Sequence, residues 1–255
     1  MAQSDDIGFT WADLRGAFGL LTRLPLPGDP GPAIARGARA AWAWPLAGAA
    51  VGVLAAIAAA LTQALGLPPT IIAALALAMQ AIVTGALHED GLADSADGLW
   101  GGHSPGRRLE IMRDSRIGSY GVLALTLTLL IRWSALAALV PGGLLPALIA
   151  CAALSRAPMA VLMAALPPAR PGGLSRSVGR PPARAVWAGC ALATLIGAAL
   201  TGWAIVPLVL VLGAVTLGCG LIAQARIGGQ TGDILGACQQ LTEIAALCVL
   251  VALWS

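Results

Sequence analysis

The chain has 255 residues, of which 58% are hydrophobic and 11% are charged, and its formal net charge is +3. A soluble domain carries about 25% charged residues. The composition therefore excludes an ordinary water-soluble domain and indicates a polytopic membrane protein. The length fits a single integral membrane domain over residues 1–255 rather than two domains.

Residues 1–41 precede the first long apolar stretch and are expected to lie at the cytoplasmic face or in the membrane interface. Met1–Asp6 lacks the basic flank and the apolar core of a cleaved signal peptide. Apolar residues then recur at helical spacing, which predicts a short amphipathic helix: Trp11, Leu14, Phe18 and Leu21. This helix either lies in the interface or packs under the bundle.

Seven apolar stretches follow within residues 42–255, each long enough for the roughly 17–25 residues with which a helix crosses a bilayer. They are 42–65, 70–88, 118–140, 145–166, 185–203, 206–224 and 234–253. Prolines lie near their ends, as expected of residues that interrupt helices. We therefore predict an all-α fold, a polytopic membrane helix bundle of about seven transmembrane helices plus the short N-terminal interfacial helix.

The charges separate between the two sets of connecting segments. All but two of the arginines fall in four alternate segments, 1–41, 89–117, 167–184 and 225–233. The opposite turns carry no charge and lie near residues 66–69, 141–143 and 203–207. Because arginine is enriched in cytoplasmic loops, we predict a multi-pass protein of the bacterial cytoplasmic membrane whose arginine-bearing segments face the cytoplasm.

Four carboxylates lie within the segment His88–Gly98, directly after an apolar stretch. Asp90, Asp94 and Asp97 fall on one stripe of a helix, because each residue turns a helix by about 100°. Like charges this close repel one another unless a cation lies between them. Mg²⁺ prefers oxygen ligands and often shares them with substrate phosphates. The pattern predicts a divalent-metal site at the inner mouth of the bundle, and a solvated helix end is the alternative.

Arginines that match phosphate geometry follow this stretch: Arg107, Arg108, Arg113 and Arg116. They indicate an anion-binding site, although a basic loop that only sets the topology has the same composition. Asp114 either orients one of them or adds a metal ligand. A later arginine group is attributed mainly to topology, with a substrate contact left open: Arg170, Arg176, Arg180 and Arg184.

The glycine-rich turn Gly228–Ala237 leads into the last apolar stretch and contains Asp233. Asp233 either caps the helix, as aspartate often does, or joins the metal site. Glu243 lies about three turns further along, where a carboxylate is costly inside a bilayer and needs a partner. The two basic residues inside predicted spans, Arg132 and Arg156, are the candidates for pairing with it.

His88 precedes the acidic stretch and is a candidate general base, with a plain hydrogen-bonding role as the alternative. The five cysteines form no CxxC pair and mostly lie in apolar stretches. We interpret them as small packing residues rather than as a disulfide or zinc framework.

The segment His88–Gly98 resembles the HxDGLADxxDG signature of the cobalamin synthases, which are adenosylcobinamide-GDP ribazoletransferases. Further segments are similar to other blocks of that family: Leu21–Pro27, Trp44–Gly48, Arg108–Gly121 and Gly228–Asp233. The resemblance covers about residues 18–245. Glu89 departs from the signature, since an apolar residue is expected there.

The resemblance implies a Mg²⁺-dependent integral membrane transferase that completes the nucleotide loop of cobalamin. A ribose hydroxyl of α-ribazole, or of its 5'-phosphate, attacks the phosphorus next to the cobinamide of adenosylcobinamide-GDP, and GMP leaves. The expected partners are these small molecules and the lipid bilayer, with no nucleic acid.

Within this resemblance the predicted roles fall on the residues already singled out. The metal ligands are four carboxylates, Asp90, Asp94, Asp97 and Asp233. The substrate-binding residues are Arg107, Arg108, Arg113 and Arg116, of which Arg113 and Arg116 would balance the charge of the reacting phosphate. The catalytic residues are His88, Asp90 and Asp94, with His88 or one of the carboxylates taking the hydroxyl proton.

Two other functions compete with this interpretation. Asp94–Gly98 also matches the DxxDG start of the CDP-alcohol phosphotransferase motif, but Leu99–Gly102 stands where Ala-Arg is expected. A cation transporter would use Asp90, Asp94, Asp97 and Glu243 as an ion path. That function predicts charges at several depths, whereas almost all charges here gather at one face.

Overall fold

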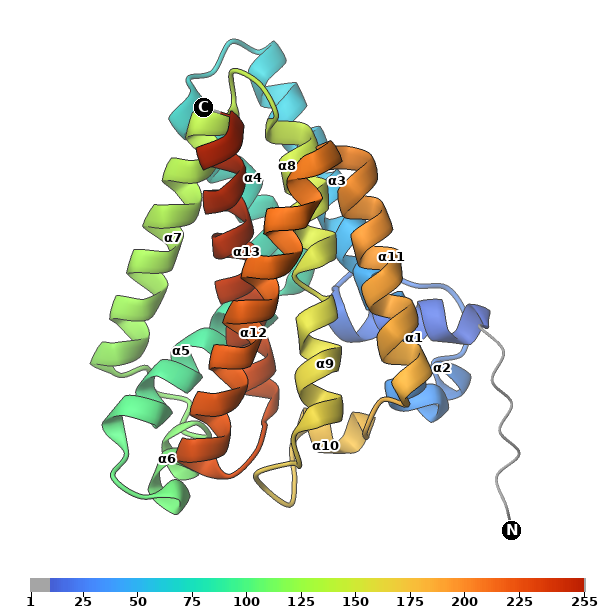
Figure 1. The fold of residues 1–255 in the computed structure, drawn as a ribbon, viewed down its shortest axis with the longest axis vertical. Helices are drawn as coiled ribbons and strands as arrows, with labels where there is room; N and C mark the ends of the chain where they lie inside the picture. Colours follow the sequence, from blue (N-terminus) through green and yellow to red (C-terminus); the bar gives the residue numbers. More distant parts are fainter. Residues whose placement is uncertain (1–9, 255) are drawn as a thin grey trace.

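The computed structural model describes residues 10–254 (Figure 1), so Met1–Asp6 and the expectation about a signal peptide lie outside the described residues. Within residues 10–254 the chain forms helices, and the only β-type pairing is a single parallel bridge between Pro168 and Gln230. The predicted all-α membrane helix bundle is confirmed.

The N-terminal segment forms α1 (Trp11–Leu21), α2 (Gly31–Arg36) and the 3₁₀ helix η1 (Gly37–Ala43). The predicted short amphipathic helix is therefore present as α1. Its Ala17 and Leu21 are buried in a core shared with Trp44 and Met159, whereas Trp11 is exposed. The helix consequently packs under the bundle, the second of the two placements considered for it.

Within residues 10–254 the bundle consists of eight helices. Several of them have a proline in the first turn, where no amide hydrogen is needed for the helix. The eight helices are α3 (Trp44–Ala64), α4 (Pro69–Thr84), α7 (Ser119–Leu139), α8 (Leu144–Leu154), α9 (Ala157–Ala165), α11 (Ala183–Thr201), α12 (Ile205–Ile227) and α13 (Gly232–Trp254).

Five helical stretches of the described chain are long and apolar enough to cross a membrane, or six if α4 and α5 (Leu87–Gly101) together form one. This count takes Ala183–Ile227 as one stretch of 45 residues. That stretch contains two separate helices of the bundle, α11 and α12, which are joined by the short 3₁₀ helix η2 (Gly202–Ala204) (Figure 1). The predicted number of seven spans is not confirmed.

A sharp bend of 89° separates α4 from α5 (Leu87–Gly101). Gly85 and Ala86 both adopt left-handed backbone conformations there, with φ of 65° and 55°. A positive φ is unfavourable for alanine, and Ala86 is the one non-glycine residue among residues 10–254 that has it. The bend directs the acidic helix α5 away from the axis of α4, so the two helices do not form one straight span.

The segments that carry most arginines gather at one end of the bundle. In Figure 1 the helices α1, α2, α6 (Pro105–Ile111) and α10 (Leu174–Val178) lie towards the lower end, whereas the α3–α4 and α7–α8 turns and the C-terminus lie at the upper end. The charge asymmetry of the sequence therefore corresponds to two different ends of the molecule. The acidic helix α5 points towards the arginine-bearing end.

Candidate active site

The acidic helix α5 crosses the start of α13 at very close range because glycines face each other. A Cβ atom on Gly91 would lie 2.9 Å from the carbonyl oxygen of Asp233, and one on Gly236 would lie 3.3 Å from Cα of His88. Larger residues would push the two helices apart. This contact brings Asp90 and Asp233, which are far apart in sequence, to the wall of the same cavity.

The three aspartates of α5 have different surroundings. Asp90 is exposed, Asp94 is partly buried and Asp97 is buried. Asp97 accepts hydrogen bonds from the backbone amides of Gly118 (2.7 Å) and Gly121 (2.9 Å), so both of its oxygens are used at the N-terminus of α7. A carboxylate is well placed there, because the amides and the helix dipole favour negative charge. Asp97 thus attaches α7 to α5.

The carboxylates crowd one another electrostatically around Asp94. Burial, and then the charges of Asp90, Asp233 and Asp97, raise the pKa of Asp94 to about 7, against the opposing effect of Arg170. Such crowding disfavours the ionised state and would be relieved by a cation. The carboxyl group therefore lies in an environment with an excess of negative charge.

The sequence predicts Mg²⁺, and the oxygen donors around Asp94 fit this metal only in part. Within residues 10–254 no three or more His, Cys, Asp or Glu side chains are arranged closely enough to hold a metal by themselves. Mg²⁺, however, is commonly held by one or two carboxylates together with substrate phosphates and water. Asp90, Asp94 and Asp233 fit such a shared site, and Asp97 fits it less well because its oxygens already accept amide hydrogens.

The cavity beside the α5–α13 crossing, which we call the main cavity, has a volume of about 220 Å³. Its walls are largely apolar and include Leu21, Met159 and Met163. The polar residues at its wall are Asp90, Asp233, His88, Arg170 and Ser175. The cavity therefore combines an apolar lining with carboxylates and a guanidinium.

Two further hollows adjoin the main cavity through shared residues. One, of about 450 Å³, includes Asp90 and Asp94 together with Arg113. The other, of about 480 Å³, includes Arg113 and Arg170. We call these two hollows the outer cleft. Asp90 and Arg170 each line both the main cavity and the outer cleft, so the three hollows adjoin one another, and we call them together the connected site.

The structure separates the four predicted substrate-binding arginines. Arg113 lines the outer cleft. Arg107 pairs with Glu110 at 3.0 Å and Arg116 pairs with Asp114 at 2.9 Å, and both arginines are exposed. Arg108 donates a hydrogen bond of 3.0 Å to the carbonyl oxygen of Arg226 at the end of α12. The hydrogen bonds that Arg116 donates to Asp114 lower the pKa of that carboxyl group.

Arg170, which the sequence analysis attributed mainly to topology, lies at the site. Its Nη2 atom is 3.1 Å from Asp233, and its buried Nη1 atom has no hydrogen-bond partner in the described residues. Backbone hydrogen bonds place it: the amide of Ala169 donates to Gln230 and the amide of Gln230 donates to Pro167. This pairing joins loops about sixty residues apart, and no sequence pattern in either loop indicates it.

Asp233 does not act as the plain helix cap that was considered for it. The hydroxyl of Thr231 accepts the amide hydrogen of Ile234 at 3.3 Å, while Asp233 binds Arg170 and the Thr231 hydroxyl. His88 is 1% exposed, and its Nε2 atom has no hydrogen-bond partner among the described residues. Both residues line the main cavity.

Comparison with known families shows to which family the chain belongs. The family model for cobalamin-5-phosphate synthase matches residues 13–251, nearly the whole chain. The chain belongs to the cobalamin-5-phosphate synthase family. This synthase is therefore an enzyme of the transferase class, and the resemblance carried by His88–Gly98 is confirmed.

Curated relatives of the synthase are named adenosylcobinamide-GDP ribazoletransferase. The chain is 50% identical over 247 residues to the protein of Bradyrhizobium diazoefficiens, with 94% of each chain covered. It is 49% identical over 234 residues to that of Mesorhizobium japonicum, with 89% of this chain and 88% of the relative covered. It is 43% identical over 252 residues to that of Brucella ovis, with 94% and 96% covered. No solved structure matches the chain.

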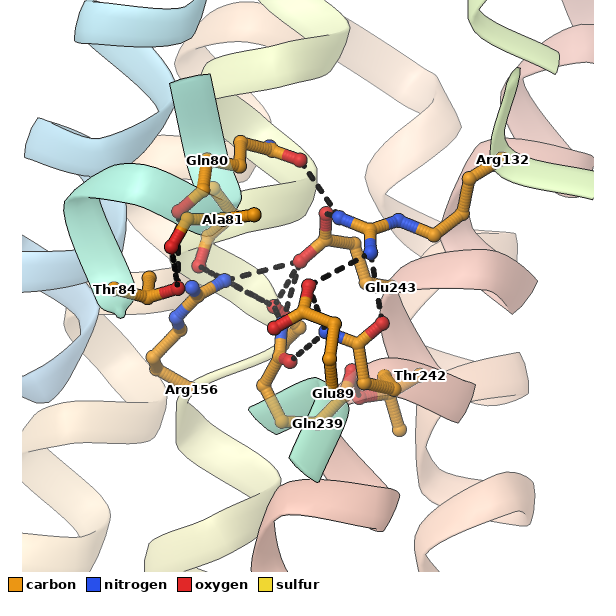
Figure 2. A network of polar contacts seen from close by, with 12 residues as sticks. Gln80, Ala81, Thr84, Glu89, Arg132, Arg156, Gln239, Thr242 and Glu243 are labelled. Atoms are coloured by element: carbon orange, nitrogen blue, oxygen red, sulfur yellow. Dashed lines mark hydrogen bonds and ion pairs between the residues drawn. The ribbon is translucent and has the colours of Figure 1, made fainter. Parts of the chain in front are cut away.

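Behind the site the synthase contains a second group of charges, which we call the buried ion network (Figure 2). Arg132 and Arg156 reach Glu243 from opposite sides, at 2.9 Å and 3.0 Å. The sequence analysis predicted that Glu243 pairs with one of these arginines, and the structure confirms a pairing and extends it to both. Gln80 and Gln239 add further hydrogen bonds to the network.

The buried ion network also explains the departure of this synthase from the family signature at Glu89. Glu89 lies 3.1 Å from Arg132 and accepts a hydrogen bond from Gln240. With Glu89 included, the network contains two glutamates and two arginines, so its formal charges balance. An acidic residue is accommodated at this position because one of its oxygens faces a buried arginine, although Glu89 also borders the outer cleft.

Proposed function

We propose that this synthase transfers the cobinamide phosphate group of adenosylcobinamide-GDP to α-ribazole or its 5'-phosphate, forming adenosylcobalamin or its phosphate and releasing GMP, with Mg²⁺ as cofactor. The observation that supports it best is the convergence of Asp90, Asp94 and Asp233 with Arg113 and Arg170 on one connected site. Anion-binding arginines beside metal-binding carboxylates are typical of phosphoryl transfer.

The reaction balances without a further reactant. A ribose hydroxyl of α-ribazole forms a bond with the phosphorus next to the cobinamide, the P–O bond of the diphosphate breaks, and GMP leaves. Bound Mg²⁺ would neutralise the negative charge that develops on the phosphate oxygens. Asp90, Asp94 and Asp233 are the residues that we assign to hold it. The hydroxyl proton passes to His88 or to one of the carboxylates.

The arginines of the site are assigned to the diphosphate. Arg113 lines the outer cleft, and the Nη1 atom of Arg170 is a buried donor without a hydrogen-bond partner among residues 10–254. A guanidinium with a free donor is suited to a phosphate oxygen. Asp97 is assigned a positioning role, because its hydrogen bonds to Gly118 and Gly121 hold α7 against the helix that carries Asp90 and Asp94.

We further propose that the site faces the cytoplasm of a bacterial cell, at the inner membrane. The support is the arginine distribution: the arginine-bearing segments lie at the same end of the bundle as the site. Such segments remain in the cytoplasm in most membrane proteins. Labelling of a single cysteine placed at exposed Arg107, in a variant without the five native cysteines, tests this orientation. A reagent that does not cross the membrane should label it only after the membrane is opened.

The activity is tested with purified protein in detergent. Protein, Mg²⁺, adenosylcobinamide-GDP and α-ribazole should release one GMP for each adenosylcobalamin formed, and chelation of Mg²⁺ should stop the reaction. Omission of α-ribazole is the control, because GMP release without an acceptor would indicate hydrolysis instead. Release of CMP from a CDP-linked lipid under the same conditions, without GMP release, would favour a CDP-alcohol phosphotransferase and overturn the proposal.

A further inference from the structure

Two residues that line the main cavity, Trp44 and His88, have buried ring nitrogens without a hydrogen-bond partner among the described residues. The side chain of Trp44, at the start of α3, is 3% exposed, and that of His88, on α5, is 1% exposed. Nε1 of Trp44 and Nε2 of His88 have no hydrogen-bond partner among the described residues. Buried indole and imidazole nitrogens normally have partners, because a buried polar group without one has lost its hydrogen bonds to water and gained none in return. Two such atoms at one cavity point to a ligand that supplies the partners.

The walls of the main cavity define what kind of ligand fits. Met159, Met163 and Trp44 contribute thioether and indole surfaces, which pack favourably against flat aromatic rings. Asp90, Asp233 and Arg170 form the polar part of the lining, and Asp90 and Arg170 also border the outer cleft. The lining therefore suits a molecule with an apolar aromatic end and a polar end that carries hydroxyl groups.

The volume of about 220 Å³ limits the size of that molecule. Pockets for drug-sized ligands typically have about 300–1,000 Å³, so the main cavity by itself suits one fused ring system better than a corrin macrocycle. A guanine ring would bring several donors and acceptors to a mostly apolar wall, where unmatched groups lose their water without compensation. A dimethylbenzimidazole ring brings two methyl groups and a single free ring nitrogen.

We propose that the main cavity binds the benzimidazole ring of α-ribazole, with Nε1–H of Trp44 donating to the free ring nitrogen and Nε2 of His88 meeting a ribose hydroxyl. The inference rests on the proposed function, since that function supplies α-ribazole as a substrate. It divides the connected site between the two substrates: the acceptor nucleoside lies in the main cavity, and the guanosine diphosphate part lies in the outer cleft. Asp90 and Arg170 lie where the two meet.

The first test is Trp44→Phe, which keeps an aromatic ring and removes the N–H donor. We expect KM for α-ribazole to rise about tenfold, equivalent to about 1.4 kcal/mol, while KM for adenosylcobinamide-GDP changes less than twofold. Trp187→Phe is the matched control, because Trp187 is 74% exposed on α11, and it should change neither KM. An equal rise of both values, or no change in either with only a lower melting temperature, would show that Trp44 is structural and would overturn the proposal.

The second test varies the ligand and measures equilibrium binding rather than turnover. The α-riboside of 5,6-dimethylindole has the shape of α-ribazole but lacks the free ring nitrogen. The unmodified protein should bind α-ribazole about tenfold more tightly than the indole riboside, and Trp44→Phe should bind the two equally. If Trp44→Phe weakens both ligands by the same factor, the hydrogen bond is absent and the assignment is wrong.

These measurements separate the proposal from the function on which it rests. Binding of α-ribazole to the purified protein requires no transfer reaction, so it is informative even if no GMP is released with both substrates present. Competition identifies the occupant of the cavity: free 5,6-dimethylbenzimidazole should displace α-ribazole, whereas GMP should not. Displacement by GMP alone would assign the main cavity to the guanosine end and overturn the division proposed here.

Discussion

Glu89 and Asp90 are neighbours in the chain, yet they belong to two opposite electrostatic environments. Glu89 also borders the outer cleft, but its Oε1 atom enters the buried ion network, where Arg132 and Arg156 balance it and Glu243. Asp90 faces the connected site, where the carboxylates outnumber their cationic partners and the pKa of Asp94 is raised by burial and by neighbouring carboxylates. Charge that is paired within the protein holds helices together, whereas charge left in excess is available to a ligand.

The helical period separates the two environments. Successive residues on a helix point about 100° apart, so α5 can turn Glu89 towards Arg132 on α7 and Asp90 towards the main cavity. The buried ion network also connects α4, α5, α7 and α13 through Gln80, Glu89, Arg132 and Glu243. It therefore fixes the orientation of the helix that carries the candidate metal ligands.

The largest effect is expected from Glu243→Gln, which removes the carboxylate between two buried arginines. The network would then carry an uncompensated positive charge in a region away from water. Breaking one partner of a buried ion pair typically costs about 3–5 kcal/mol. We expect a clear fall in the thermal melting temperature of the detergent-solubilised protein and a loss of activity that follows the loss of folded protein.

Two further variants show whether pairing is the cause. Adding Arg156→Met to Glu243→Gln restores charge balance and should recover part of the lost melting temperature. Asp114→Asn breaks the exposed pair with Arg116, and exposed pairs contribute only about 0–1 kcal/mol. An equal loss of stability in Asp114→Asn and Glu243→Gln would contradict the distinction between the two environments.

The opposite behaviour is expected for Asp94→Ala in the connected site. Removing a carboxylate from a crowded group relieves repulsion, so the folded protein should be as stable as the original or more so. Loss of a group that stabilises the transition state typically lowers turnover by 10²- to 10³-fold, about 2.7–4 kcal/mol. GMP release at ordinary Mg²⁺ concentration measures it, and Glu110→Ala on the exposed face of α6 is the control. Full activity of Asp94→Ala would contradict the assignment of the metal ligands.

The sequence predicted those features that depend on local spacing. The 3.6-residue period placed Asp90, Asp94 and Asp97 on one stripe, and the cost of a lone carboxylate in a bilayer predicted a partner for Glu243. The hydropathy pattern also placed the helices close to their observed bounds. These predictions need only the residues of one element, or one residue and its cost of burial.

Features that depend on distant segments could not be predicted in this way. The apolar stretch 70–88 was expected to be one span, but Gly85 and Ala86 bend it, because a left-handed conformation at two positions is not visible in hydropathy. Arg170 reaches Asp233 only because the Pro168–Gln230 bridge aligns two loops. Asp97 was predicted as a metal ligand alone, and its bonds to the start of α7 depend on how two helices pack.

A third charged group lies below the bundle, and the pH dependence of stability tests how much its pairing contributes. Asp13 is buried and accepts hydrogen bonds from the amide of Thr10, from Arg36 and from Trp42. Burial alone raises the pKa of this carboxyl group, but these bonds outweigh it and lower the pKa below the ordinary value of 3.8. The carboxylate therefore stabilises the fold above about pH 4, and this stabilisation is lost as the pH falls through the lowered pKa.

Asp13→Asn should accordingly destabilise the protein by about 1.5–3 kcal/mol near neutral pH, the range for hydrogen bonds to charged groups. Because asparagine does not titrate, the difference in melting temperature between the original protein and the variant should shrink below about pH 4. Melting curves in detergent from pH 7 to pH 3 measure this difference. A difference that stays constant over that range would show that the Asp13 charge contributes nothing beyond its packing.

The smallest effect is expected from Arg170→Ala. This variant tests a residue at which the paired charges and the excess charges meet. Arg170 pairs with Asp233 but keeps one buried donor without a partner, so it combines a structural contact with a group available to a phosphate. We expect KM for adenosylcobinamide-GDP to rise about tenfold, equivalent to about 1.4 kcal/mol, which is near the lower end of the contribution of a hydrogen bond to a charged group. The matched control is Arg107→Ala, because Arg107 is exposed and pairs only with Glu110 in the structure. A larger effect of Arg107→Ala than of Arg170→Ala would mean that the diphosphate lies on the outer face of α6, as the sequence analysis allowed, and that the free donor of Arg170 has no ligand.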